Sequence, residues 1–293
     1  MAAAPIDLKH LELERVIGVY VIDTPHGPAL FDCGPATCYD ELRSRVDLSE
    51  IRHLLLSHIH LDHAGAAGHI VRDHPQIQVH VHAVGAPHLA DPTRLIASAR
   101  RLYGDTLDAL YGEPLPVPSQ NVVQIDDDAA GLKAFATPGH ASHHASYMGD
   151  DGTLYAGDAT GVRILPGKFV IPHAPPPDID LEAWERTFEQ ILLHQPARLA
   201  LIHFGIVDGT EEVAQHVARA RTTLATWAER VRDGMNEDGF IEAAEADISA
   251  SEGPRAAAYA RAAPLPQSFH GLERYWRKRR ERDAAAADPA ASR

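Results

Sequence analysis

His58-Ile59-His60-Leu61-Asp62-His63 places four side chains that can bind a metal ion within six residues, directly after the apolar run Leu54-Leu55-Leu56-Ser57. A short apolar run of this kind indicates a buried strand. In an extended chain, side chains alternate between two faces, so His58 and His60 project to the same side and can bind one cation. Asp62 and His63 follow in the turn that opens the next helix, and they face a second point in space. The hexapeptide therefore predicts two adjacent metal sites.

Three later segments end a predicted strand, or follow one, with the same kind of side chain. They are Thr137-Pro138-Gly139-His140, Leu154-Tyr155-Ala156-Gly157-Asp158 and Leu199-Ala200-Leu201-Ile202-His203. Each candidate ligand stands beside or close to a glycine, at a strand terminus where side chains from separate strands can converge. The alternative is a set of solvated loops, since the chain has 19 histidines. The repeated placement at strand ends favours a metal site with several ligands.

Together, the hexapeptide, the TPGH segment, the Gly157-Asp158 pair and the strand-end His203 resemble the motifs of the metallo-β-lactamase-fold superfamily of metallohydrolases. The resemblance covers about residues 12–210, with the motifs in the order of the family. It implies an α+β fold, a four-layered αββα sandwich with the metals at one edge between two sheets. It also implies the ligands of two ions: His58, His60 and His140 for the first, Asp62, His63 and His203 for the second, and Asp158 for both.

The residue types agree with hydrolytic metal chemistry. Imidazole and carboxylate ligands without a nearby thiolate suit zinc, iron or manganese, and Cys33 and Cys38 lack a C-x-x-C spacing. Two divalent ions, most readily zinc, about 3.5 to 4 Å apart would share a bridging water whose pKa falls toward neutrality. The hydroxide so formed is the expected nucleophile, and the two charges would stabilise the developing oxyanion. Asp62 is the candidate catalytic residue because it can orient this nucleophile or accept its proton.

Composition limits the class of protein. The chain has 293 residues, of which 45% are hydrophobic and 23% charged, enough for one large domain with two sheets. A net charge of −14 argues against a nucleic-acid partner, and so against the RNA-processing nucleases of the superfamily. We find no signal-peptide pattern and no apolar run of membrane-spanning length, and only two cysteines. We therefore expect a cytoplasmic protein that acts on a small molecule, without a membrane partner.

The elements around the motifs follow from periodicity and turn signals. We expect strands at residues 15–23, 28–32 and 78–82 and helices at residues 39–46 and 65–73. Residues 85–118 depart from this compact pattern, with one helix at 92–103, a second at 106–111 and a proline-stiffened return. A helical insertion at this point can cover the metal cleft or meet the second subunit of a homodimer.

Five further side chains are candidates for supporting or substrate-binding roles. Tyr103 and Tyr111 carry polar tips on the insertion, with core packing as the alternative. Asp32 is a candidate acid that holds a metal-binding imidazole in one tautomer, and a plain turn aspartate is the alternative. His144 is expected to form hydrogen bonds behind the metals. Arg163 can clamp a substrate carboxylate, against the alternative of a surface salt bridge.

The C-terminal third is mainly helical. Asp180 is a candidate cap for a helix at residues 181–194, after a stiff proline-rich segment at 172–178 that we expect to line one rim of the site. Further helices are expected at residues 211–232, 237–248, 254–262 and 271–282. The expected organisation is a catalytic domain at 1–235, a helical extension at 236–282 and a disordered tail at 283–293.

The expected reaction is hydrolysis of an ester, thioester, lactone or amide. The motifs are most similar to those of glyoxalase II-like thioesterases and acyl-homoserine lactonases. However, no basic cluster suited to glutathione is present, and Gly161 stands where the lactonases carry a tyrosine. An uncharacterised branch of the superfamily is therefore expected. The alternatives are a phosphodiesterase, a mononuclear iron enzyme that oxidises a persulfide through His58, His60, His140 and Asp158, and a metal-holding protein without chemistry, which is disfavoured because every ligand position is filled.

Overall fold

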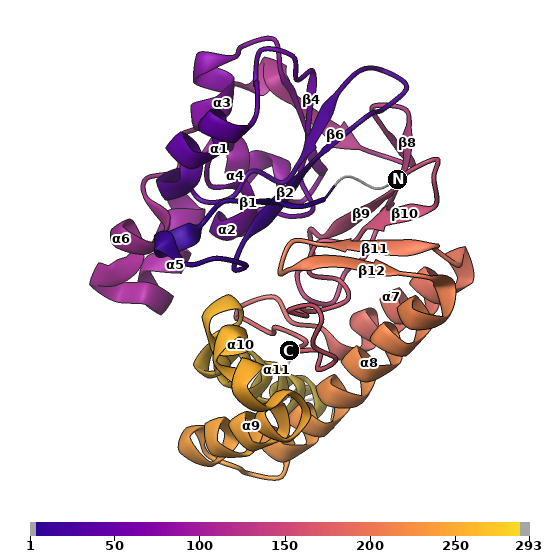
Figure 1. Cartoon of the computed structure of the whole chain (residues 1–293). Coiled ribbons are helices and arrows are strands. Elements are labelled where there is room, and N and C mark those ends of the chain that lie inside the picture. Colours follow the sequence, from indigo (N-terminus) through magenta and orange to yellow (C-terminus); the bar gives the residue numbers. More distant parts are fainter. Residues whose placement is uncertain (1–3, 288–293) are drawn as a thin grey trace.

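Two six-stranded sheets form the centre of the molecule, and helices cover their outer faces (Figure 1). The computed structural model describes residues 4–287. The first sheet contains, in order, β1 (Ile6–Asp7), β2 (Gly18–Ile22), β3 (Ala29–Phe31), β4 (His53–Leu55), β5 (Gln78–His82) and β6 (Val122–Ile125). The second contains, in order, β12 (Gly205–Asp208), β11 (Arg198–Leu201), β10 (Thr153–Tyr155), β9 (Ala145–Met148), β8 (Leu132–Ala136) and β7 (Asp128–Ala129). This arrangement confirms the α+β two-sheet sandwich.

The apolar runs in the sequence form strands that are covered by other parts of the protein on both faces of the sheet. Strands β3 to β6 run parallel, and every residue of β3 is fully buried, which explains its uninterrupted apolar sequence. Aromatic side chains fill the space between the sheets, with the Phe31 and Tyr147 rings edge to face at 5.8 Å. The Tyr147 hydroxyl donates a 2.6 Å hydrogen bond to the carbonyl of Leu56. The second sheet thereby fixes the backbone just before the hexapeptide.

Outer helices complete the four layers. Helices α1 (Tyr39–Arg45), α3 (Ala67–Asp73) and α4 (Ala86–Ala90) accompany the first sheet, and α7 (Leu181–His194) and α8 (Thr210–Arg232) cover the second (Figure 1). The helix expected at residues 65–73 is in fact preceded by a separate turn of helix, α2 (Leu61–Ala64), that contains half of the hexapeptide. Gly65 separates the two helices, and a Cβ on it would lie 2.9 Å from the backbone of Pro35. A glycine is needed here because two backbone segments approach closely.

The insertion forms two helices, as the sequence predicts. Helix α5 (Thr93–Tyr103) and helix α6 (Leu107–Tyr111) are joined by a 3₁₀ turn (Gly104–Thr106), and they lie beside the N-terminal segment at one side of the molecule (Figure 1). The imidazole Nε2 of His10 and the hydroxyl of Thr37 both bond to the carbonyl of Leu110, at 2.7 and 3.0 Å. These contacts attach the insertion to the N-terminal half of the chain.

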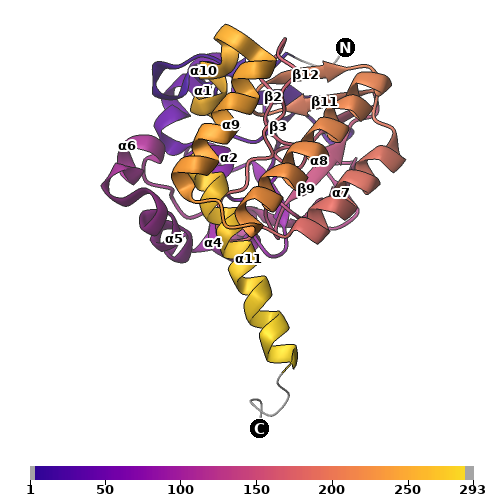
Figure 2. The ribbon, with the colours of Figure 1, turned by 90° about the horizontal axis from the view of Figure 1, so that it is seen from below.

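Three helices form the C-terminal extension: α9 (Glu237–Glu252), α10 (Ala256–Ala262) and α11 (Leu265–Ala287). Helix α11 begins six residues before the expected start, and its C-terminal part projects from the body of the molecule (Figure 2). The predicted disordered tail is wrong for residues 283–287, which continue this helix because alanine has a high helix propensity. The rest of that tail lies outside the described residues. Between residues 4 and 287, no helix has the length and apolarity needed to cross a bilayer.

Candidate metal centre

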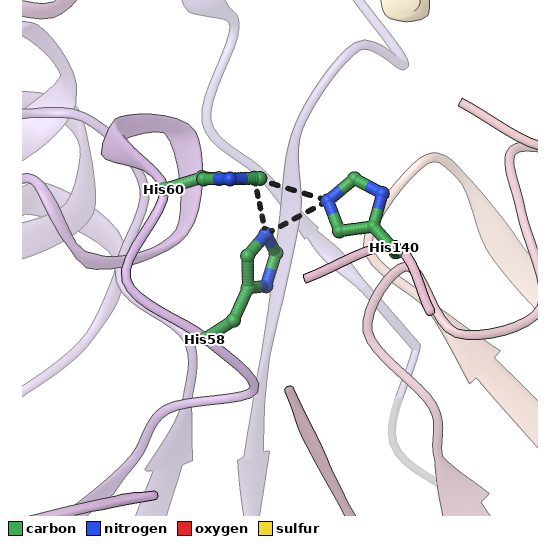
Figure 3. Close-up of side chains that lie close together, drawn as sticks. All are labelled: His58, His60 and His140. Carbon is green, nitrogen blue, oxygen red and sulfur yellow. Dashed lines mark hydrogen bonds between the residues drawn. The ribbon is translucent and has the colours of Figure 1, made fainter. Parts of the chain in front are cut away.

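The hexapeptide lies at the edge between the two sheets, and three imidazole rings meet there (Figure 3). His58 Nε2 is 2.8 Å from His60 Nδ1, and His140 Nε2 is 3.2 Å from His58 Nε2 and 3.0 Å from His60 Nδ1. The expected strand geometry is wrong in one respect: β4 ends at Leu55, so His58 and His60 lie in the loop that leads into α2. The loop nevertheless brings both rings to one point.

Hydrogen bonds on the far side of the rings determine which nitrogen faces the cluster. His140 Nδ1 donates to the carbonyl of His173 at 2.7 Å, so its Nε2 presents a lone pair. His58 Nδ1 lies 3.0 Å from the Ser57 hydroxyl, which already donates to Asp32 and therefore accepts from the imidazole. Two bare lone pairs 3.2 Å apart repel each other unless a cation lies between them. The donor set fits a bound metal ion.

A second group lies beside the first. His63 Nε2 is 3.6 Å from Asp62 Oδ2, and His203 Nε2 is 3.5 Å from the same oxygen. His63 Nδ1 donates to Asp32 Oδ2 at 2.8 Å, and His203 Nδ1 donates to the carbonyl of Val16 at 2.6 Å. In the neutral rings both Nε2 atoms therefore present lone pairs, and both are buried without a hydrogen-bond partner in the described part of the chain.

Asp158 lies between the two groups. Its Oδ2 is 3.6 Å from His140 Nε2 and 3.5 Å from His63 Nε2, while its Oδ1 is 3.7 Å from His203 Nε2. Oδ1 is also buried and unpartnered among the described residues. One carboxylate therefore faces ligand atoms of both groups, which is the placement expected of a bridging ligand.

The electrostatics of the cluster favour bound cations. Burial would raise the pKa of Asp158, but the neighbouring His63 and His203 hold it well below its ordinary value. Burial and the surrounding imidazoles lower the pKa of His58 and His60 well below the ordinary value, so these rings are neutral ligands. Burial would lower the pKa of His63 and His203, but Asp158 and Asp62 raise it above the ordinary value, so without an ion these two imidazoles supply the positive charge that a bound cation would provide.

The position of each ligand follows from the fold. His140, Asp158 and His203 come two to four residues after the ends of β8, β10 and β11 in the second sheet, as the sequence predicts. Gly139 adopts φ 138°, and a Cβ there would clash with the Trp184 side chain. The indole of Trp184, on α7, donates to the carbonyl of Ala159 at 2.7 Å. Helix α7 therefore supports two ligand loops at once.

Two predicted supporting residues lie around the centre. Asp32 is fully buried and accepts from the Ser57 amide at 2.7 Å as well as from His63, which agrees with an orienting acid and not with a plain turn residue. His144 Nδ1 contacts Thr137 Oγ1 at 2.7 Å, and its Nε2 accepts from the Asp158 amide at 3.0 Å, so it forms hydrogen bonds behind the ligands.

Arg163 forms the expected salt bridge, but not at the surface. It is buried, with its guanidinium 2.8 Å from the carboxylate of Glu212 on α8. It is not among the residues that line the cavity beside the metal centre, so its position does not support contact with a substrate carboxylate. Its backbone amide donates to the carbonyl of His203 at 2.7 Å and fixes that ligand.

A cavity of about 360 Å³ opens onto the metal centre. His60, Asp62, Asp158 and His203 form one end of it. Tyr103 and Tyr111 line its wall with their hydroxyls 3.1 Å apart, and the two rings also pack edge to face against each other. Burial raises the pKa of Tyr103 to about 12, which keeps this phenol protonated at neutral pH.

Sequence reasoning misses the backbone acceptors of the site. The carbonyls of Val16 and His173 orient His203 and His140, but a carbonyl oxygen occurs in every residue and leaves no signal in a sequence. The predicted rim is correct, since Pro175, Pro176 and Pro177 line the cavity. The N-terminal residues Leu11 and Leu13 also line it, and no sequence signal indicates that contribution.

Comparisons with known proteins identify the family of the chain. A sequence profile described as the metallo-beta-lactamase superfamily matches residues 15–203. The metallo-beta-lactamase fold-containing protein ST1585 of Sulfurisphaera tokodaii is 24% identical over 207 residues, which are 68% of this chain and 76% of that protein. ST1585 also has a crystal structure, described as that of an archaeal metallo-beta-lactamase superfamily protein from Sulfolobus tokodaii. It matches with a TM-score of 0.61 and 22% identity over 77% of this chain and 84% of that chain.

Two other solved structures share the fold. TTHA1429 from Thermus thermophilus, a metallo-beta-lactamase family protein, has a TM-score of 0.58 and 19% identity over 92% of this chain and 89% of its own. TTHA1623, crystallised in a di-iron-bound form, has a TM-score of 0.54 and 21% identity over 72% of this chain and 96% of its own. At these identities the structures support the fold alone, whereas the profile covers more than half of the sequence and includes all seven candidate ligands. The chain therefore belongs to the metallo-β-lactamase superfamily.

Proposed function

We propose that the protein is a dinuclear metal-dependent hydrolase that cleaves an ester, thioester, lactone or amide bond of a small molecule. Membership of the superfamily supports metal-dependent hydrolysis in general. One observation carries the finer proposal: buried ligand atoms without a protein partner, at His63 Nε2, His203 Nε2 and Asp158 Oδ1, lie beside a first group in which the Nε2 atoms of His58 and His140 face each other at 3.2 Å. A single ion would leave one of these groups without a cation.

In this proposal His58, His60 and His140 would hold the first ion, Asp62, His63 and His203 would hold the second, and Asp158 would be a ligand shared by both. Nitrogen and carboxylate ligands of this kind suit zinc first, with iron or manganese as alternatives. When bound, two divalent ions supply a Lewis acid for the carbonyl oxygen and lower the pKa of water to generate a nucleophile.

The remaining steps belong to the protein itself. The Asp62 side chain is 23% exposed, in contrast to the buried His63, and it lies at the cavity end where a substrate carbonyl would arrive. Its carboxylate is placed to orient the attacking water or to accept its proton at Oδ2. The protonated Tyr103 hydroxyl can donate a hydrogen bond to a substrate oxygen within the same cavity.

The decisive experiment compares Asp62→Ala with Asp150→Ala on esters, thioesters, lactones, amides and phosphodiesters. We expect Asp62→Ala to abolish turnover while its circular dichroism stays native, because the substitution removes a ligand and a proton acceptor but no core contact. Asp150 is exposed and lies away from the cavity, so Asp150→Ala should keep wild-type rates. Turnover retained by Asp62→Ala would contradict the two-metal proposal.

Metal analysis of the purified protein distinguishes the iron alternative. The dinuclear hydrolase requires close to two ions per chain and activity that is lost on chelation. One iron per chain, with oxygen consumed in the presence of a persulfide, would instead support the oxidative reaction at His58, His60, His140 and Asp158. Cleavage of phosphodiesters alone would move the proposal to phosphoryl transfer.

A further inference from the structure

We propose that the cavity beside the metal centre binds an uncharged aliphatic acyl chain, so that the substrate is a medium-chain acyl ester, thioester, lactone or amide. This inference rests on the proposed function and adds a substrate class to it. The cavity volume of about 360 Å³ lies at the small end of the range for ligand pockets, about 300 to 1,000 Å³. It therefore suits a short or medium chain better than a large polar molecule.

One face of helix α5 lines the cavity. Leu95, Ser98, Ala99 and Leu102 recur at the spacing of one helix face, and all four line the cavity. None of the residues of α5 is buried, although an amphipathic helix normally packs its apolar face into a core. The apolar face of α5 is therefore directed at the cavity, and an apolar occupant would complete its burial.

The N-terminal segment and α6 add further leucines to the lining of the cavity. Leu11 and Leu13 of the N-terminal segment and Leu110 of α6 line the cavity, and Leu11 is 49% exposed. Removing such apolar surface from water is favourable by roughly 25 cal/mol per Å². The hydrogen bond between His10 and the Leu110 carbonyl holds these two segments together before any ligand binds. An acyl chain that enters the cavity would therefore contact an apolar wall that is already formed.

The lining of the cavity carries little charge outside the metal centre. Among the described residues that line the cavity beyond the metal centre, only Arg261 carries a permanent charge, and its side chain is exposed. The phenols of Tyr103 and Tyr111 bond to each other, so they do not require a charged ligand. An ionised group within the chain would therefore find no buried partner along the leucine wall. The polar end of the cavity is the metal centre, where the acyl carbonyl would lie.

Binding of the acid products tests the inference independently of turnover. Acetate, butanoate, hexanoate and octanoate would be titrated into the metal-loaded protein and into the chelated protein by calorimetry. We expect the Kd to fall about three- to fourfold for each added methylene until the cavity is filled, with the same increment in both forms. Chelation should weaken all four ligands together, since the carboxylate contributes equally in each.

The outcomes separate the two proposals. If esters are hydrolysed but affinity and kcat/KM do not change with chain length, the aliphatic substrate class is wrong and the hydrolase stands. If affinity rises with chain length but no acyl compound is hydrolysed, the proposed reaction fails and the chain-binding cavity stands. Adipate binding more tightly than hexanoate, with the advantage lost in Arg261→Ala, would assign a chain with a terminal carboxylate and overturn the uncharged chain.

A matched pair of variants locates the binding site. Leu102→Asp introduces a charge into the cavity wall, whereas Ala97→Asp introduces the same charge on the exposed face of the same helix. We expect Leu102→Asp to weaken octanoate at least tenfold and acetate little, and Ala97→Asp to leave the series unchanged. Leu95→Trp would narrow the cavity and shorten the longest chain that gains affinity, which provides a second test should Leu102→Asp fold poorly. Equal chain-length series in all three variants would overturn the assignment.

Discussion

At the scale of single residues, Asp32 links the first sheet to the metal centre. It follows β3 and accepts hydrogen bonds from the Ser57 amide, the Ser57 hydroxyl and His63 Nδ1, at 2.7, 2.7 and 2.8 Å. The hydroxyl of Ser57 in turn orients His58. A single carboxylate thereby determines which nitrogen of one imidazole in each group faces the metals.

Replacing Asp32 should therefore weaken metal binding without removing a ligand. Asp32→Asn keeps the volume but replaces one of the two acceptor oxygens with an NH₂ group, so either His63 Nδ1 or the Ser57 amide loses its acceptor and the orientation of the imidazole is weakened. We expect a loss of metal affinity of about 10- to 100-fold, measured by competition with a chromophoric chelator. The exposed Asp150→Asn serves as the control. Wild-type affinity in Asp32→Asn would restore the interpretation of Asp32 as a plain turn residue.

The role of a side chain is easier to predict from the sequence when its residue type has few uses than when it depends on a partner far along the chain. His58, His60, Asp62, His63, His140, Asp158 and His203 are recognisable because imidazole and carboxylate groups at strand ends have few other uses, and the structure brings all seven together. Arg163 is harder, since its burial depends on Glu212 in a helix that is far along the chain. The carbonyls of Val16 and His173 belong to the backbone, so the residue type does not indicate that they act as acceptors.

At the scale of elements, the C-terminal extension supports the metal centre. Glu252, at the end of α9, is buried and accepts from the amides of Lys168 and Phe169 at 2.7 Å each. Gln267 of α11 lies 3.1 Å from His173 Nε2, and the carbonyl of His173 orients His140. The extension therefore holds the segment between Asp158 and the proline-rich rim in place.

The role of Glu252 predicts a pH-dependent stability difference. Burial alone would raise its pKa, but the amides of Phe169 and Lys168 hold the pKa below the ordinary value. A lowered pKa in the folded state means that its contribution is complete above the unfolded pKa of about 4.3 and is lost as the pH falls further. Glu252→Gln should lower the free energy of unfolding by about 2 kcal/mol at pH 7 and by less near pH 4, measured by urea titration. A difference that does not change with pH would show that the charge is unimportant.

Helix ends are predictable where a local signal defines them. Helix α7 begins after Asp180, whose side chain accepts from the Ala183 amide at 2.8 Å, and this cap is visible in the sequence. The predicted start of α11 is too late because Gly271 resembles a helix boundary. In the structure a Cβ on Gly271 would overlap the Ala174 carbonyl, so this glycine permits close packing within the helix. Tertiary contact, and not local propensity, selects that residue.

At the scale of the whole molecule, the metal centre joins two halves that each have an apolar core. One core cluster contains Phe31, Leu54 and Tyr147, and the other contains Leu154, Trp184 and Trp227. The order of the motifs along the chain and the two-sheet sandwich could be predicted because the ligand motifs match the family pattern. The packing of the C-terminal extension could not be predicted. The apolar faces of its helices are compatible with several packing partners.

This arrangement predicts what removal of metal does to the whole protein. The cores do not depend on the ions, so chelation should leave the circular dichroism spectrum at about 20 °C unchanged. Because the folded chain binds the ions and the unfolded chain lacks the site, free metal at about 100 to 1,000 times its Kd stabilises the fold by about 2.7 to 4.1 kcal/mol for each ion. Loss of one ion corresponds to a fall in melting temperature of roughly 5 to 15 °C for a chain of this size, and loss of both to about twice that, reversed when zinc is added back. Asp62→Ala, which lacks one ligand, should show a smaller shift than wild type. An unchanged melting temperature after metal loss has been verified by elemental analysis would mean that Asp158 and the imidazoles are stable in the folded chain without cations, and the dinuclear centre would have to be abandoned.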